Sequence, residues 1–198
     1  MELYHDVRSN DVLELRQSVE SKEFYLAGKR IFDIITSSVL LVFFSPLLLF
    51  VAIIIKTTSK GPVIFKQKRV GQFGKEFVMY KFRTMTDYNY NPDGLKYLEL
   101  IKKGCFVKTK NDPRVTRFGK YLRQTSLDEL PQLFNVLKGD MSMVGPRPSE
   151  LSLSGNEIIK YARTVVKPGI TGLWQIKNRH NSTINDMITY DKIGRAHV

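Results

Sequence analysis

Charged side chains between Asp112 and Pro148 have the types and spacing that phosphate chemistry requires. One acidic pair, Asp128-Glu129, stands among the basic residues Arg114, Arg117, Lys120, Arg123 and Lys138. Arginine and lysine hold phosphate by charge-assisted hydrogen bonds, and a carboxylate can attack phosphorus or hold a divalent metal ion. A Pro146-Arg147-Pro148 corner ends the stretch and restricts the backbone around its arginine. The stretch therefore predicts a site for a phosphorylated ligand.

The acidic pair also has a purely structural interpretation. Ser126 to Glu129 has the S-x-x-E form of a helix capping box, and apolar residues follow at helical spacing: Leu130, Leu133, Phe134 and Leu137. In a capping box, the serine and glutamate side chains satisfy free backbone N–H groups at the start of a helix. Pro131 suits a first helical turn, so the helix could also start at Leu130. These residues alone favour capping over catalysis.

The order of several short motifs resembles a known family. The motifs are Lys81-Phe82-Arg83-Thr84-Met85, Asp112-Pro113-Arg114, Leu122-Arg123, Ser126 to Leu130, Pro131-Gln132, Asn135-Val136, Gly139-Asp140-Met141-Ser142, Val144 to Pro148, Lys167 to Gly172 and Leu173-Trp174-Gln175. With this set, the chain from about Lys29 to about Asp191 resembles the bacterial sugar transferases, which are monotopic polyprenyl-phosphate phosphoglycosyl transferases. So many motifs in one order favour the catalytic interpretation of the acidic pair.

The resemblance implies a reaction and its catalytic residues. A sugar 1-phosphate would pass from a UDP-sugar to undecaprenyl (polyprenyl) phosphate, giving polyprenyl-diphosphate-sugar and UMP. This step initiates the synthesis of exopolysaccharide, capsule, O-antigen or glycoprotein glycans. Asp128 is implied as the nucleophile on the sugar-linked phosphorus, and Glu129 as the group that activates the lipid phosphate or positions the metal. The metal would be Mg²⁺, held by both carboxylates and the substrate oxygens.

Further substrate contacts are implied on the basic residues of the same motifs. Arg123 precedes the acidic pair at the family's spacing and is expected to bind phosphate, with Arg114 as a second contact. Arg147, held between Pro146 and Pro148, suits a preset contact to the nucleotide.

An apolar run from Ile31 to Ile55 is about 25 residues long, enough for a bilayer span of about 20. Basic residues lie at both ends, Lys29-Arg30 before it and Lys56 and Lys60 after it, and give no positive-inside asymmetry. Ser45-Pro46 interrupts the run. The proline removes one backbone hydrogen bond, and the serine hydroxyl can satisfy the released carbonyl. By composition a kinked spanning helix is favoured, and a helix–break–helix that re-enters the same face also fits.

The family resemblance favours the second topology, because the family's membrane element is re-entrant and its Ser-Pro break matches Ser45-Pro46. The expected anchor comprises Lys29, Arg30, Ser45 and Pro46, with Asp33 at the membrane interface near the two basic residues. Both ends would then face the cytoplasm, which places the protein at the cytoplasmic face of a bacterial cell membrane.

The remaining chain predicts small elements. Val63 to Arg69 and Lys75 to Thr84, joined by a Gly71–Gly74 turn, are typical of a β-hairpin, and Leu95 to Lys103 and Leu151 to Tyr161 favour short helices. The predicted fold class is α+β: a small, mostly helical cytoplasmic domain with a β-hairpin, anchored by one re-entrant membrane helix.

Four segments are expected in sequence order. They are an N-terminal arm over 1–28, the membrane element over 29–60, the catalytic domain over 61–192, and a foreign or artefactual tail over 193–198. The tail is set apart because it departs from the aromatic-rich segment that follows in the family.

The net charge and the composition limit the classes of binding partner that the chain can have. A net charge of +12 indicates anionic partners, which are nucleic acid, an anionic membrane or a phosphorylated substrate. Nucleic acid is disfavoured because no reading helix or aromatic platform is recognisable. Cys105 is the single cysteine, so an internal disulfide is excluded and a reducing compartment fits. The alternative function is a non-catalytic, basic, membrane-anchored scaffold of polysaccharide assembly, and later glycosyltransferases of the same pathway are candidate partners.

Overall fold

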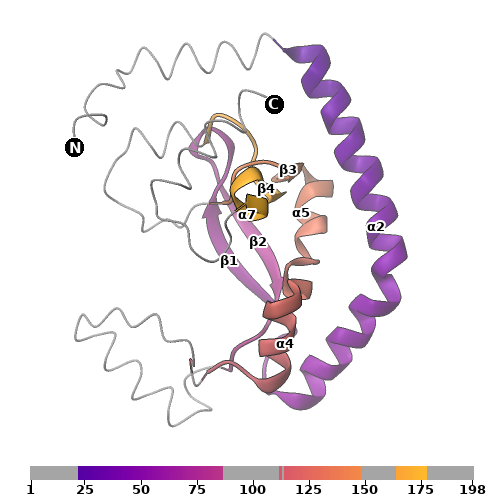
Figure 1. The fold of residues 1–198 in the computed structure, drawn as a ribbon, viewed down its shortest axis with the longest axis vertical. Helices are drawn as coiled ribbons and strands as arrows, with labels where there is room; N and C mark the ends of the chain where they lie inside the picture. Colours follow the sequence, from indigo (N-terminus) through magenta and orange to yellow (C-terminus); the bar gives the residue numbers. More distant parts are fainter. Residues whose placement is uncertain (1–21, 87–111, 113, 149–163, 178–198) are drawn as a thin grey trace, which may run out of the picture. The chain divides into compact units, whose positions relative to one another are not determined.

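A computed structural model describes residues 22–86, 112, 114–148 and 164–177. In chain order, its elements are helix α2 (Glu23–Thr58), strand β1 (Ile64–Val70), the 3-10 turn η1 (Gln72–Gly74), strand β2 (Glu76–Phe82), helix α4 (Arg117–Thr125), the 3-10 turn η3 (Leu127–Glu129), helix α5 (Gln132–Lys138), strands β3 (Ser142–Val144) and β4 (Gly169–Thr171), and helix α7 (Leu173–Lys177) (Figure 1). The mixed α+β class and the β1–β2 hairpin are confirmed. The predicted helices at 95–103 and 151–161 and the tail at 193–198 lie outside the described residues.

The chain divides into two compact units, and each is described by itself. The first contains Met1–Leu41, Gln67–Met79 and Gln132–Val198, and the second contains Val42–Lys66 and Tyr80–Pro131. Helix α2 and both strands of the hairpin each contribute residues to both units.

Helix α2 is 36 residues long and begins at Glu23, ahead of the expected start at Lys29. Its apolar stretch has a mean hydropathy of 2.9, so the helix is long and apolar enough to cross a membrane. Large apolar side chains on it, including Phe24, Val42 and Phe43, are exposed. An uncovered apolar surface of this length indicates a helix that contacts lipid.

The backbone of α2 stays helical through Pro46, so the predicted helix–break–helix form is not what the structure shows. Proline lacks the N–H that would bond to the carbonyl four residues earlier, which belongs to Val42. The Ser45 hydroxyl donates to that same carbonyl at 2.7 Å. The predicted role of the serine is therefore confirmed, and it explains how the helix continues past the proline.

The core of the second unit joins three elements. Val51 and Ile55 of α2, Phe82 of β2 and Leu122 of α4 are buried against one another. Helix α4 starts at Thr116, whose hydroxyl accepts a hydrogen bond from the backbone N–H of Gly119 at 2.8 Å. This N-cap satisfies one of the free donors of the first turn and fixes where α4 begins.

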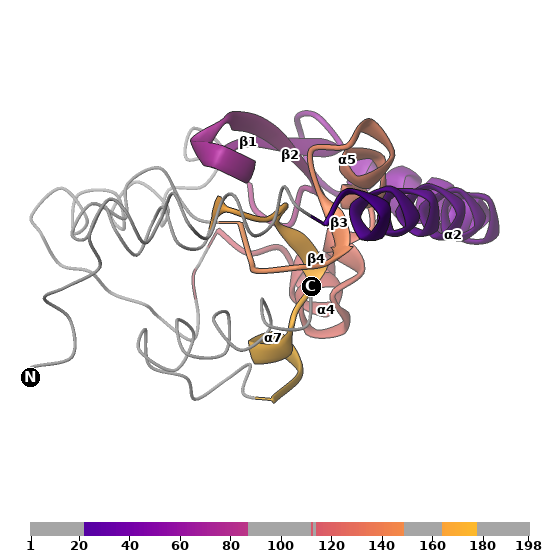
Figure 2. The same cartoon turned by 90° about the horizontal axis from the view of Figure 1, so that it is seen from above.

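The first unit is built around a short parallel pair of strands. Strands β3 and β4 pair Ser142 with Gly169 and Val144 with Thr171, and α5 lies beside β3 in both views (Figures 1 and 2). Beyond the pair, the N–H of Gly145 donates to the carbonyl of Thr171 at 2.9 Å. These bonds hold the start of the Pro146-Arg147-Pro148 corner against β4.

Asp33 ties the first part of α2 to β3 within the same unit. Its side chain is buried at 3% exposure, and its carboxylate accepts from the Ser142 hydroxyl at 3.1 Å and from the Met143 N–H at 3.0 Å. The Lys29 ammonium is 3.9 Å from the same carboxylate. The expected place of Asp33 near Lys29 is therefore confirmed, and its position at the membrane interface stays a prediction.

Gly119 offers a stability test of the second unit. A Cβ there would lie 2.1 Å from the carbonyl oxygen of Thr84. Gly119→Ala should therefore destabilise the protein by about 1–3 kcal/mol, because backbone must move to admit the methyl group. Thermal unfolding of the detergent-solubilised protein measures the loss. Gly28→Ala is the control: its Cβ meets nothing within 4 Å, so an equal loss there would contradict the packing described.

Candidate active site

Ser126 turns the chain so that the acidic pair follows directly after α4. It has a left-handed backbone with φ of 60°, ends α4 and precedes η3, which carries Asp128 and Glu129. A non-glycine residue in this region costs on the order of 1 kcal/mol, which the surrounding structure must offset. The Glu129 N–H donates to the Ser126 carbonyl at 3.1 Å and closes the turn.

The capping-box interpretation of this segment is wrong. The Ser126 side chain makes no cap hydrogen bond, and the full helix α5 begins only at Gln132. The Glu129 carboxylate instead accepts a hydrogen bond from the Lys81 ammonium at 3.1 Å. A partner on β2 has displaced the local backbone interaction that the S-x-x-E pattern predicts.

The ion pair of Lys81 with Glu129 is largely shielded from solvent, with side-chain exposures of 16% and 14%. A shielded pair is screened less by salt than a surface pair, and removing either partner leaves an uncompensated charge. Lys81 therefore holds Glu129 in one place and brings positive charge to the acidic pair.

Asp128 has a perturbed carboxyl group. Burial raises its pKa above the usual value, and the neighbouring negative charge of Glu129 acts in the same direction. The positive charges of Lys81 and Arg123 oppose this shift and favour the carboxylate. A partly desolvated carboxylate beside two cations is the kind of group that serves as a nucleophile or a metal ligand.

Arg123 lies in the last turn of α4, where its Nε donates to the Thr84 hydroxyl at 2.9 Å. Its two terminal nitrogens donate to no other group in the part of the chain that the structure describes. The hydroxyl orients the guanidinium, whose remaining donors are available to an anion.

Arg114, a second predicted phosphate contact, is bonded to Asp112. Its Nε donates to the two carboxylate oxygens at 2.8 and 3.0 Å, and a terminal nitrogen pairs with the same carboxylate. The hydrogen bonds from Arg114 hold the pKa of Asp112 below its usual value. In this state Arg114 is engaged with a carboxylate of its own chain.

The predicted site residues are divided between the two units. Asp128, Glu129, Arg123 and Arg114 belong to the second unit, and Arg147 with Pro146 and Pro148 belongs to the first. The Pro146 carbonyl accepts from the Gly169 N–H at 2.9 Å, which fixes the corner within its own unit.

The acidic pair has suitable chemistry for Mg²⁺. No group of three or more His, Cys, Asp or Glu residues that could hold a metal occurs in the described ranges. Mg²⁺ usually takes one or two protein carboxylates and completes its shell with water and substrate phosphate oxygens. Asp128 and Glu129 are adjacent carboxylates on one short turn, so their number and type fit such a shared shell.

Sequence reasoning missed two residues of this site. In the sequence, Lys81 and Thr84 are recognisable only as members of one of the family's motifs. In the structure, Lys81 donates a hydrogen bond to Glu129, and the Thr84 hydroxyl accepts one from Arg123. The alternation of side chains along the strand could have indicated Lys81, because Lys81 and Arg83 lie on the same side of the strand.

Comparison with known proteins identifies the family of this chain. A profile of the bacterial sugar transferase family matches residues 24–193, so the chain belongs to that family. It is 51% identical over 161 residues to the UDP-glucose:undecaprenyl-phosphate glucose-1-phosphate transferase of Klebsiella pneumoniae, covering 78% of this chain and 32% of that protein.

Two further relatives are similar. The identity is 41% over 197 residues to the undecaprenyl-phosphate galactose phosphotransferase of Salmonella typhimurium, covering 92% of this chain and 40% of that protein. It is 39% over 176 residues to the exopolysaccharide production protein ExoY of Rhizobium meliloti, covering 83% of this chain and 75% of that protein. The chain thus spans less than half the length of the first two relatives.

The Asp128 environment predicts an unusual pH dependence of stability. Because its folded-state pKa is raised, its ionisation costs stability as pH rises from the unfolded value of about 3.9 through the folded value. Asp128→Asn should raise the unfolding temperature at pH 7, and this gain should vanish below about pH 3.9. Thermal unfolding followed by circular dichroism across this range measures the effect.

Asp112→Asn provides a control of opposite sign. The pKa of Asp112 is lowered, so its ionised form adds stability above the unfolded value, and that stability is lost as pH falls through the folded value. Asp112→Asn should lower the unfolding temperature at pH 7. A lower unfolding temperature for both variants would contradict the environment described for Asp128.

Proposed function

We propose that this chain transfers a sugar 1-phosphate from a UDP-sugar to undecaprenyl phosphate, giving undecaprenyl-diphosphate-sugar and UMP as the first step of polysaccharide or glycan synthesis. The observation that carries the proposal is the shielded acidic pair, with Lys81 on Glu129 and with Arg123 acting on Asp128. The names of the Klebsiella and Salmonella relatives, which both contain undecaprenyl phosphate, support this lipid as the acceptor.

In the first half-reaction, an oxygen of the Asp128 carboxylate attacks the phosphorus that bears the sugar. The bond from this phosphorus to the UMP oxygen breaks, UMP leaves with the electron pair, and an acyl phosphate carrying the sugar remains on Asp128. Partial burial favours this step because a poorly hydrated carboxylate needs less desolvation before it attacks.

In the second half-reaction, an oxygen of the lipid phosphate attacks the same phosphorus. The bond to Asp128 breaks, and the carboxylate is regenerated. Glu129 accepts a proton from the lipid phosphate or orients it, and the Lys81 hydrogen bond that holds this carboxylate supports the role. Arg123, and Arg114 once it exchanges its own carboxylate partner for substrate, would neutralise phosphate charge.

Asp128 and Glu129 are the residues that would hold Mg²⁺, together with substrate oxygens. The bound ion would offset the negative charge of the diphosphate. Arg147, held by Pro146 and Pro148, is the proposed contact to the nucleotide.

We propose that the site lies at the cytoplasmic face of the membrane, with α2 as a re-entrant anchor that turns at Ser45-Pro46 without a break in its helical backbone. Support comes from basic residues at both ends of the apolar stretch and from the exposed apolar side chains of α2. Anionic lipids and later glycosyltransferases of the pathway are the proposed partners there.

The nucleophile is tested by substituting it with its amide. Asp128→Asn keeps the size of the side chain but removes the attacking anion, so turnover should fall about a thousandfold or more while the fold persists. UDP-sugar labelled in the sugar and its phosphate, supplied without lipid, should label the parent protein at Asp128 and release an equal amount of UMP. Glu129→Gln should impair turnover severely and still allow this labelling.

Glu76→Gln is the matched control for the labelling experiment. It removes a carboxylate whose side chain is 54% exposed on the hairpin, and activity should be unchanged. Near-normal turnover by Asp128→Asn would refute the nucleophile assignment. No UMP release by the parent protein with any UDP-sugar would favour the scaffold interpretation.

Topology is tested with single cysteines introduced at Lys22 and Lys60 in a Cys105→Ser background. In intact cells, a membrane-impermeant maleimide should label neither position, and permeabilised cells should be labelled at both. Replacing Ser45 and Pro46 with leucine should favour a span and expose one end. Labelling of one position in intact cells without the leucine changes would establish a spanning helix instead.

A further inference from the structure

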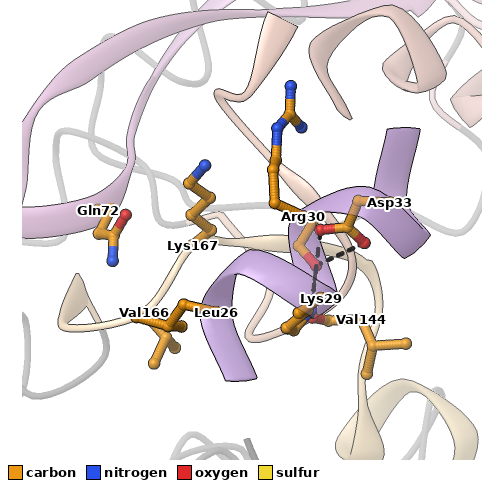
Figure 3. Close-up of a pocket in the computed structure, with 10 residues that line it drawn as sticks. Leu26, Lys29, Arg30, Asp33, Gln72, Val144, Val166 and Lys167 are labelled. Atoms are coloured by element: carbon orange, nitrogen blue, oxygen red, sulfur yellow. Dashed lines mark hydrogen bonds and ion pairs between the residues drawn. The ribbon is translucent and has the colours of Figure 1, made fainter. Parts of the chain in front are cut away.

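A cavity of about 250 Å³ lies in the first unit, beside the start of α2. Its charged lining residues are Lys29, Arg30, Asp33 and Lys167 (Figure 3). Asp33 is the single acidic residue of this lining, and its carboxylate already accepts hydrogen bonds from β3. The wall of the cavity therefore carries net positive charge.

Two of these cations are bound to protein groups. The Arg30 guanidinium donates to the carbonyls of Val136 and Leu137 at 2.6 Å each, and so caps the carboxyl end of α5. Lys29 donates to the Ser142 hydroxyl and to the Val144 carbonyl, the latter at 3.1 Å. Both side chains are fixed in place and still contribute positive charge to the cavity.

Lys167 differs, because its ammonium donates to no group in the part of the chain that the structure describes. Burial lowers its pKa, and so do the nearby charges of Arg30 and Lys29, while Asp33 and Asp140 act in the opposite direction. Figure 3 shows the Lys167 and Arg30 side chains extending in the same direction. A partly buried ammonium without a partner, beside two further cations, would be stabilised by an anion.

We propose that this cavity binds a phosphate group, with the Lys167 ammonium as its main donor and with Lys29 and Arg30 supplying supporting charge. Lysine binds phosphate as a point charge with three donors, and a phosphate oxygen can accept from more than one of them. Apolar side chains on the same part of α2, including Phe24 and Ile31, are exposed. Both a lipid headgroup and a soluble phosphate present the required chemistry.

The proposal is independent of the proposed sugar transfer, and its test does not use activity. The full chain in a phosphate-free maltoside detergent is treated with a water-soluble amine-acylating reagent, and mass spectrometry follows modification at each lysine. Inorganic phosphate at about four times its dissociation constant should slow acylation of Lys167 about fivefold. Lys68, whose side chain is 71% exposed, should react at an unchanged rate and serves as the internal control.

A second arm distinguishes the source of the phosphate. Vesicles of phosphatidylglycerol are compared with vesicles of a galactosyl diacylglycerol, which lacks phosphate but covers the same surface. Protection by phosphatidylglycerol alone would assign a lipid headgroup, and protection by inorganic phosphate would assign a soluble ligand. Acylation of Lys167 that is unaffected in both arms, or slowed equally by chloride at matched ionic strength, would overturn the proposal.

Variants separate a phosphate site from a general charge effect. Lys29 should also be protected by phosphate in the parent protein. Lys167→Met should abolish this protection, Lys167→Arg should preserve it, and Lys68→Met, which removes the same formal charge, should leave it intact. Persistent protection of Lys29 in a folded Lys167→Met protein would show that Lys167 is not the main donor.

Discussion

The ion pair between Lys81 and Glu129 is the interaction on which the candidate active site depends. It joins strand β2 to the short turn η3 and holds a carboxylate where solvent is largely excluded. Without the ammonium, the turn would carry two adjacent negative charges with reduced hydration, and mutual repulsion would favour opening the turn. With it, the second carboxylate of the pair is kept close to its neighbour, and the negative charge of the site is partly balanced.

The fold was predictable where the signal was local. The hairpin follows from alternating side chains around a Gly71–Gly74 turn, and the structure places β1 at Ile64–Val70 and β2 at Glu76–Phe82. The hydrogen bond from the Ser45 hydroxyl to the Val42 carbonyl was also predictable, because Ser45 and Pro46 are neighbours in the chain. Each of these features needs only a few consecutive residues.

The prediction failed where a distant residue competes with a local pattern. The segment from Ser126 to Glu129 has the sequence pattern of a capping box, but Glu129 forms an ion pair with Lys81 of strand β2. Asp33 accepts hydrogen bonds from Ser142 and Met143 of β3, and no pattern near Asp33 in the sequence indicates these donors. Sequence spacing carries no information about such partners unless the packing of the elements is already known.

The donors that surround Asp33 have a consequence for the order of folding. Ser142 and Met143 follow Asp33 by more than a hundred positions, so during synthesis α2 emerges long before its carboxylate has these partners. In the interval Lys29, one turn away on the same helix, can balance its charge. Deep insertion of this end of the helix into lipid would be unfavourable, because the charged carboxylate would lose its hydration. In the proposed anchoring role of α2, stable insertion of the helix is therefore coupled to completion of β3.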